Sequence, residues 1–229
     1  MIFRQLQDQA SNTYTYFLAD EKTKEGVVID PVLENVERDF QLINHLGIKL
    51  LWILDTHVHA DHITGSSMLK LKTGAKTGLG KATQVACVDH LFAEGEKIIF
   101  GQHLLQVIST PVHTNGCTTY YLDRDCVFTG DTLLIQGCGR TDFQEGSSEK
   151  LFSSVHDKLF ILPDHVVVYP GHDYAGRTQS TIGEEKKSNP RLKTGTTLAQ
   201  FVEIMKNLKL DYPKQMDRAL PANLSCGRI

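Results

Sequence analysis

Residues 56–62 read Thr-His-Val-His-Ala-Asp-His and follow, after Asp55, a run of five apolar residues at 50–54 that is typical of a buried strand. In an extended chain alternate side chains point the same way, so His57, His59 and Asp61 would share one face. The next residue, His62, would begin the following helix. Four side chains of metal-binding type at the carboxyl end of a strand predict a metal site.

Three further segments each place one histidine or aspartate just after a predicted strand, beside glycine or proline. They are Thr110–Thr114 with His113, Phe128–Thr132 with Asp131, and Tyr169–Tyr174 with His172. Ligand sites of open α/β sheets usually lie at the carboxyl ends of the strands. The shared context of these distant segments therefore predicts one common site at a sheet edge.

Taken singly, these residues have simpler interpretations. Asp61 could cap the next helix, Asp131 could stabilise a turn, and His113 or His172 could be an ordinary loop residue. The other five histidines lie in helix or strand patterns without partners and are expected to be incidental: His45, His90, His103, His156 and His165.

Strand patterns dominate both halves of the chain, and helical patterns lie between them. Strands are expected at residues 13–18, 26–30, 50–54, 97–100, 104–109, 118–122, 126–129 and 166–169, and amphipathic helices at about 36–46, 148–159 and 197–208. Ser147 or Ser148 would cap the second helix. The last twenty residues look irregular. This order predicts a single α/β domain over residues 1–229, with two sheets and helices packed outside them.

Composition excludes several classes of function. The chain has 229 residues and a formal net charge of −3, which argues against a nucleic-acid partner. No stretch is apolar enough for a membrane span or a signal peptide. The five cysteines form no Cys-x-x-Cys pair, so a disulfide framework is not expected and a reducing, cytoplasmic location is the simplest prediction.

The whole ligand pattern resembles the metallo-β-lactamase superfamily. That resemblance implies an αββα sandwich of two mixed sheets, with helices on the outer faces and a metal site at one edge. It rests on His57-x-His59-x-Asp61-His62 together with His113, Asp131 and His172.

Four longer segments narrow the resemblance to the persulfide dioxygenase, or sulfur dioxygenase, family. Besides Thr56–His62 (THVHADH), they are Phe128–Gln144 (FTGDTLLIQGCGRTDFQ), Tyr169–Tyr174 (YPGHDY), Asn189–Leu192 (NPRL) and Pro221–Gly227 (PANLSCG). One departure is Val112, where the family usually has glycine. Because a branched residue does not easily adopt positive φ, the loop that carries His113 is expected to differ locally.

The family resemblance implies one Fe(II) per chain, held by His57, His113 and Asp131. Two imidazoles and one carboxylate on one face form the facial triad of non-haem iron oxygenases. The implied reaction converts glutathione persulfide, dioxygen and water to sulfite and glutathione. The remaining superfamily ligands would lie outside the iron's coordination and orient it or organise water: His59, Asp61, His62 and His172.

The resemblance also suggests residues that bind substrate. Glutathione carries two carboxylates, and Arg140, Tyr174 and Arg177 are the candidates to bind them. Arg140 could instead brace the 137–143 loop. Cys226 would lie near the substrate entrance or be an inert structural thiol. A homodimer and a separate sulfurtransferase partner are further expectations.

Two alternatives remain open. A dinuclear zinc thioester hydrolase resembling glyoxalase II could use all seven ligand-type residues, with a bridging hydroxide as nucleophile. Such hydrolases normally have a sizeable helical C-terminal domain, whereas only 57 residues follow His172 here. The second alternative is not an enzyme: an iron or persulfide sensor would bind the same metal and ligand without turnover.

Overall fold

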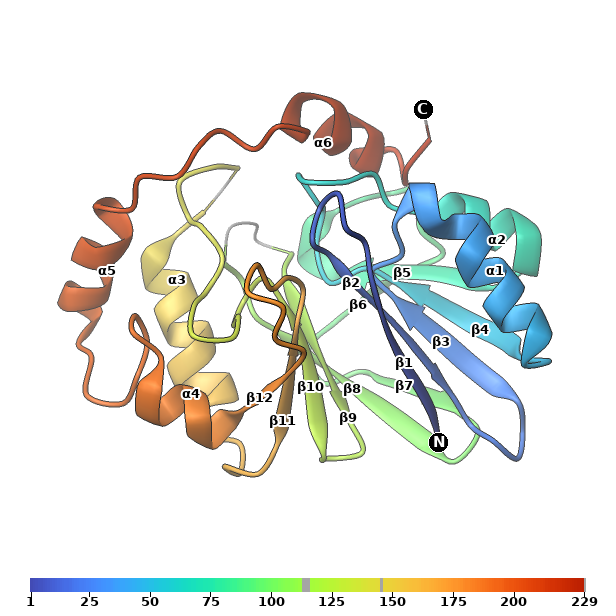
Figure 1. Cartoon of the computed structure of the whole chain (residues 1–229), viewed down its shortest axis with the longest axis horizontal. Helices are drawn as coiled ribbons and strands as arrows, with labels where there is room; N and C mark the ends of the chain where they lie inside the picture. The colour runs from blue at the N-terminus through green and yellow to red at the C-terminus, as the bar shows by residue number, and fades with distance from the viewer. Residues whose placement is uncertain (113–115, 145, 229) are drawn as a thin grey trace.

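The computed structural model describes residues 1–112, 116–144 and 146–228, which form two six-stranded sheets packed face to face (Figure 1). The first sheet has the order β1 (Ile2–Gln7), β2 (Tyr14–Ala19), β3 (Glu25–Ile29), β4 (Lys49–Leu54), β5 (Lys76–Gly80) and β6 (His90–Phe92). The second has the order β12 (Ser180–Thr181), β11 (Val167–Pro170), β10 (Cys126–Gly130), β9 (Thr118–Leu122), β8 (His103–Ser109) and β7 (Lys97–Phe100).

Both sheets mix parallel and antiparallel pairs, as predicted. Strands β3 to β6 run parallel, β10 pairs with β11 in parallel, and the other pairs are antiparallel. Parallel pairing matters for the site because it brings the carboxyl ends of neighbouring strands to one edge.

Helices cover the outer faces of both sheets. Side chains of α1 (Val36–His45) and α2 (Ser66–Thr73) pack on the first sheet, where apolar residues at helical spacing face it. The second sheet is covered by α3 (Ser148–Ser153) with its π-helical continuation Ser154–Leu159, α4 (Ile182–Ser188) and α5 (Leu198–Lys206). Short 3-10 turns lie at Leu33–Asn35 and Lys81–Thr83. The αββα sandwich is therefore confirmed.

The space between the sheets is filled largely by aromatic rings. Tyr16 and Phe128 face each other from opposite sheets with ring centroids 4.8 Å apart, and Tyr120 packs in the same cluster. The Tyr16 hydroxyl donates to the Pro170 carbonyl at 2.6 Å, and the Tyr120 hydroxyl donates to the Asp55 carbonyl at 3.0 Å. Each of these two phenols thus joins one sheet to the end of a strand in the other.

The predicted elements are found within a few residues of their expected bounds, with two corrections at helices. Helix α2 begins at Ser66, after Gly65 as N-cap, so His62 does not begin it and Asp61 does not cap it. The last twenty residues are not all irregular, because α6 spans Met216–Leu224. Pro221 lies inside α6 and no side chain caps its start, so the sequence signals of a helix are weak there.

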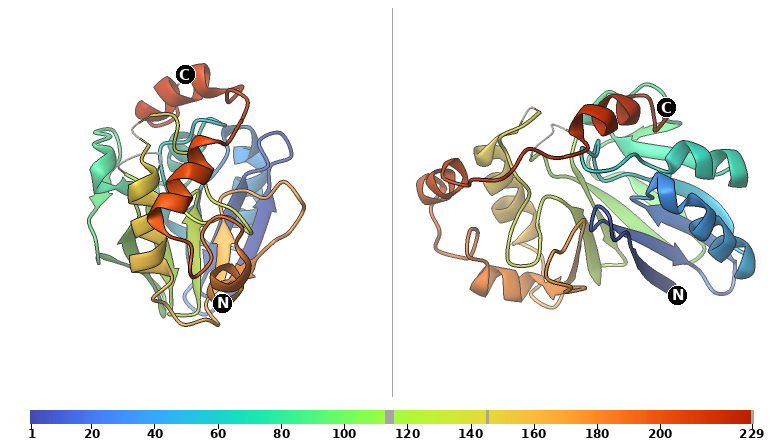
Figure 2. Two further views of the ribbon diagram at one scale, coloured as in Figure 1. Left: turned by 90° about the vertical axis from the view of Figure 1, so that its left-hand side faces the viewer. Right: turned by 45° about the horizontal axis from the view of Figure 1, so that its top comes forward.

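Helix α6 crosses the end of the sandwich where the site lies (Figure 2). A disulfide between Cys226 and Cys87 fastens the chain just after this helix to the segment before β6. The expectation that cysteines stay unpaired is therefore wrong for these two. Their separation of 139 residues offers no sequence signal, because only the fold brings them together. Cys117, Cys126 and Cys138 are buried thiols outside this disulfide.

None of the helices in the described residues has both the length and the apolar character needed to cross a membrane.

The disulfide leads to a stability prediction. Replacing both cysteines, Cys87→Ala with Cys226→Ala, should lower the free energy of unfolding by up to about 5 kcal/mol, because the bridge closes a very long loop. Urea unfolding with and without dithiothreitol measures the effect. Reductant should destabilise the wild type and leave the double variant unchanged. An unfolding midpoint of the wild type that does not respond to reductant would contradict the prediction.

Candidate metal centre

The candidate ligands meet at the edge formed by the carboxyl ends of strands in both sheets. His57, His59, Asp61 and His62 lie in the loop between β4 and α2, and Asp131 follows β10. His172 follows β11 and forms an isolated β-bridge with Thr13, which precedes β2. His113 lies outside the described residues. The described candidates from separate strand ends thus lie together at one edge.

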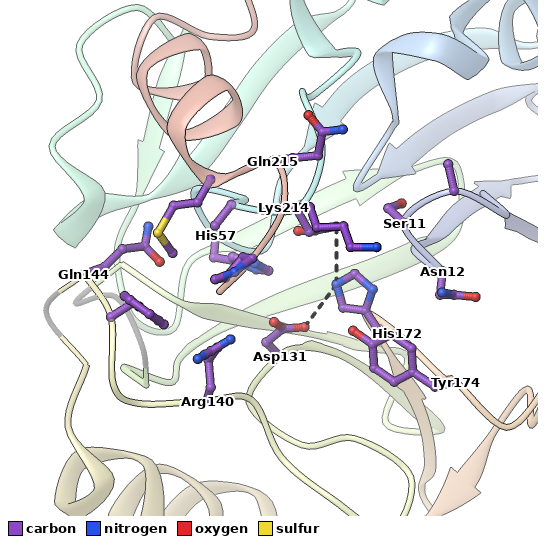
Figure 3. Close-up of a pocket in the computed structure, with 16 residues that line it drawn as sticks. Ser11, Asn12, His57, Asp131, Arg140, Gln144, His172, Tyr174, Lys214 and Gln215 are labelled. Carbon is purple, nitrogen blue, oxygen red and sulfur yellow. Dashed lines mark ion pairs between the residues drawn. The ribbon is translucent and has the colours of Figure 1, made fainter. Parts of the chain in front are cut away.

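The described ligands lie close enough to share a metal. One ligand atom each of His57, His59 and Asp61 fall within 4.8 Å of one another. His172 Nε2 lies 3.5 Å from Asp131 Oδ1 and 3.7 Å from Asp61 Oδ2 (Figure 3). All three histidines of the loop between β4 and α2 are buried, as is His172.

Several buried polar atoms here have no hydrogen-bond partner among the described residues. They are His59 Nδ1, His62 Nε2, Asp131 Oδ1 and His172 Nδ1. A buried polar atom without a partner is costly, and a metal ion satisfies imidazole and carboxylate lone pairs directly. A donor set of imidazoles and carboxylates suits iron or zinc. The residues present therefore fit a metal centre.

Asp30 orients His57 through Thr56. Thr56 Oγ1 donates to Asp30 Oδ2 at 2.9 Å, so it accepts at 2.9 Å from Nδ1–H of His57. The proton on Nδ1 leaves the Nε2 lone pair of His57 available as a ligand. The Thr56 backbone N–H also donates to Asp30 Oδ1, at 2.6 Å.

Asp30 was not among the predicted site residues, although a signal for it existed. It is the last residue of the strand predicted at 26–30 and precedes a proline, which resembles the context that identified the other acidic candidate, Asp131. Parallel pairing of β3 with β4 places it beside the loop that carries His57, and its N–H donates to the Leu54 carbonyl.

His59 lies against three carboxylates. Its Nε2 is 3.1 Å from Asp30 Oδ1 and 3.7 Å from Asp55 Oδ1, and its Nδ1 is 3.9 Å from Asp61 Oδ1. Burial alone would lower the pKa of His59, but these carboxylates raise it to about 10. Asp55 is itself held by the hydroxyls of Thr64 and Ser66. The arrangement keeps the imidazole of His59 fixed from both sides.

Two glycines let the strand ends approach the site closely. Gly130 has φ of +49°, and a Cβ there would lie 2.5 Å from Thr56 Oγ1. A Cβ at Gly171 would lie 2.9 Å from Asp131 Oδ1. Any larger residue at either position would push apart the segments that carry His57, Asp131 and His172.

Asn223 of α6 holds the ligand loop from the other side. Its Nδ2 donates to the carbonyls of His59 and His62, both at 2.8 Å, and its Oδ1 accepts from the N–H of Thr64 at 2.9 Å. Sequence analysis did not single out Asn223, because a helix was not expected there. One buried side chain therefore satisfies three backbone groups of the metal-binding loop.

A cavity of about 460 Å³ opens over the ligands (Figure 3). Arg140 and Tyr174, two of the predicted substrate contacts, line it, together with His57, Asp131 and His172. The ring of Tyr174 lies parallel to that of His172, with centroids 6.0 Å apart. Partial desolvation and the Asp131 and Asp61 carboxylates raise the pKa of Tyr174 to about 12, so its phenol remains a donor at neutral pH.

Three other predicted residues have different surroundings. Arg177 donates to Asp173 Oδ1 and to the Ile135 carbonyl, and the described lining of the cavity does not include it. Cys226 forms the disulfide rather than a free thiol. Val112 is buried in the core under the outer helices, and the described residues with positive φ do not include it.

The five histidines expected to be incidental lie outside the ligand cluster. Two of them do have partners: His90 contacts Glu96 at 2.8 Å, and His103 contacts Asp123 at 2.6 Å. His156 stacks on Phe152 in the covering of the second sheet.

Comparison with known proteins agrees with this geometry. The family model described as the metallo-beta-lactamase superfamily matches residues 9–172. The mitochondrial persulfide dioxygenases ETHE1 of Mus musculus and Homo sapiens are each 47% identical over 229 residues, covering 99% of this chain and 89% of theirs. A crystal structure of ETHE1 from Myxococcus xanthus has a TM-score of 0.96 and 48% identity, covering 99% of this chain and 100% of that one.

The role of Asn223 is testable by substitution. Asn223→Ala should lower the free energy of unfolding by about 3 kcal/mol, because two carbonyls and one N–H of a buried loop lose their hydrogen-bond partner. Urea unfolding of the purified variant measures this. Ser225→Ala, an exposed change in the adjoining turn, should stay within about 0.5 kcal/mol of wild type. Equal unfolding midpoints for both variants would show that Asn223 does not support the loop.

Proposed function

Since this chain belongs to the persulfide dioxygenase family of the metallo-β-lactamase superfamily, we propose that it oxidises glutathione persulfide. One persulfide, one dioxygen and one water give one glutathione, one sulfite and two protons. The observation that carries this proposal is 47% identity, over 99% of the chain, to proteins named persulfide dioxygenase.

The proposed metal is a single Fe(II) held by His57, His113 and Asp131. These two imidazoles and one carboxylate would hold the iron, which would supply the redox chemistry between a persulfide sulfur and dioxygen. The orientation of His57 by Thr56 supports the part of His57 in this set. The part of Asp131 is supported by its buried Oδ1, which has no hydrogen bond to the described residues. Asp131 also brings negative charge to the cation.

The remaining polar residues would position the reactants. Tyr174 lines the cavity beside His172 and can donate its phenol proton in a hydrogen bond to substrate. His59 and His62 are not in the described lining of the cavity and are held by Asp30 and Asp61, which suits them to fixing the ligand loop. Phe143 and Met216 add apolar lining that limits water near the reacting sulfur.

The dinuclear zinc hydrolase remains a second candidate because of one observation. Asp61, His62 and His172 supply further ligand-type groups, and His62 Nε2 and His172 Nδ1 have no partner among the described residues. These groups could hold a second ion next to the first. Metal content and substrate preference separate the two candidates, and turnover separates both from a sensor.

Three further expectations stay proposals: a cytoplasmic location, a homodimer and a separate sulfurtransferase that delivers the persulfide. The disulfide between Cys87 and Cys226 removes the cysteine argument for a reducing compartment. Sedimentation or light scattering of the purified chain tests the dimer.

The first test of the function is direct. Protein purified without added metal should contain about one iron per chain, and it should consume oxygen and produce sulfite when glutathione persulfide is added. Metal analysis and an oxygen electrode give both readouts. Two zinc ions per chain with thioester hydrolysis and no oxygen uptake would overturn the dioxygenase in favour of the hydrolase. Stoichiometric iron and persulfide binding without oxygen uptake would favour the sensor.

A pair of ligand variants tests the metal set. His57→Ala and His113→Ala should each lose iron and activity, because each removes one of three proposed ligands. His62→Ala should keep most of its iron, since it would act outside the coordination sphere. Metal analysis of the folded proteins, checked by circular dichroism, provides the measurement. Equal metal loss in His62→Ala and His57→Ala would indicate a dinuclear centre.

A further inference from the structure

We propose that Lys214 is a specificity-determining residue that binds a carboxylate of the thiol substrate. The inference rests on the proposed function and adds to it a residue that motif comparison did not identify. It places a cationic contact on the segment before α6, across the cavity from Arg140.

The charges around the cavity divide into two groups. Asp61 and Asp131 lie with the histidines at the metal centre. Among the described lining residues outside that centre, the charged ones are Arg140 and Lys214, and both are cationic. A tripeptide thiol with its sulfur at the metal and its carboxylates directed outward would match this distribution.

The charge of Arg140 is already largely satisfied within the protein. Its Nε and Nη2 donate to the two oxygens of Asp142 at 2.7 and 2.8 Å, and its Nη1 donates to the Asp211 carbonyl at 2.8 Å. The guanidinium also lies 4.4 Å from the centre of the Phe143 ring. Arg140 is thus bonded both within the 137–143 loop and to the segment before α6, and Asp142 offsets the positive charge it presents to a ligand.

Lys214 is different. Within the described residues its ammonium has neither a hydrogen bond nor an ion pair, although it lines the cavity. Figure 3 shows it on the side of Ser11, Asn12 and His172, with Asp131 between it and Arg140 in that view. Among the lining residues that the structure describes, Lys214 thus carries a positive charge that no carboxylate offsets.

The backbone that carries Lys214 is held in place. Pro213 precedes it, and the Pro213 carbonyl accepts from the N–H of Met216 at 3.1 Å, which closes a turn into α6. Met216 and Ala219 are buried, and the disulfide at Cys226 fastens the far end of the helix. Lys214 therefore needs only side-chain ordering to reach a ligand, which keeps the entropic cost of contact small.

The consequence is selectivity for anionic thiols. A substrate with carboxylates gains the Lys214 contact, whereas hydrogen persulfide or a persulfide with esterified carboxyls does not. Because the ammonium is exposed, the contribution should be moderate and should weaken as ionic strength rises.

The test compares Lys214→Met with wild type, Lys214→Arg and Lys209→Met. The last variant removes one exposed lysine from the same segment, away from the described cavity lining. For glutathione persulfide, Lys214→Met should raise KM about three- to tenfold with little change in kcat. For the dimethyl ester of the same persulfide the KM of all four proteins should agree. Lys214→Arg should largely retain the wild-type KM, and Lys209→Met should match wild type throughout.

Binding provides a readout that does not need turnover. Calorimetry with glutathione and with its dimethyl ester should show that the wild type prefers the free acid and that Lys214→Met loses this preference. If the wild type consumes no oxygen, the proposed function fails, yet the calorimetric comparison still decides the role of Lys214. Equal binding of the free acid by wild type and Lys214→Met would overturn the inference, and so would an equal loss for acid and ester.

Discussion

The carboxylate of Asp30 is the group on which the metal-binding edge depends. A buried carboxylate must be satisfied by donors, and Asp30 accepts from the Thr56 N–H, the Thr56 hydroxyl and His59. These bonds fix where the chain turns after β4, and hence where the ligands of residues 57–62 lie. Parallel pairing of β3 with β4 puts Asp30 beside that turn. The sheet topology therefore fixes the geometry of the ligand loop through Asp30.

The C-terminal helix completes this edge from outside. Asn223 satisfies backbone groups that a loop of consecutive ligands cannot satisfy itself, because its side chains are directed to the site. The disulfide fastens the same segment to the first sheet. The described ligand loop is thus held by Asp30 from within the sandwich and by α6 from above, which suits a metal site that must keep its geometry.

Much of this could be predicted from sequence, and the limits have physical causes. Apolar runs that are followed by histidine or aspartate locate the strand ends. They can be recognised because the spacing of apolar residues and the residues that form turns are local features of the sequence. The layers follow from the order of strands and helices. The disulfide and the role of Asn223 could not be predicted, because each depends on contacts across more than a hundred residues. Helix α6 is not predicted because Pro221 lies inside it and no side chain caps its start, although the family resemblance includes its PANLSCG segment.

Metal ligands are easier to recognise from sequence motifs than the residues that contact the substrate. Ligands for a metal must be particular residue types at fixed places, so they leave a pattern in the chain. A carboxylate can be held by a cation on any segment that reaches the cavity. Arg177 looked suitable from its position beside the YPGHDY segment, but it is bound to Asp173. Lys214 has no motif around it, and only the fold shows that it lines the cavity without an ion pair to any described residue. Substrate specificity then depends on residues around the cavity such as Lys214, whereas the metal ligands at the sheet edge determine the reaction.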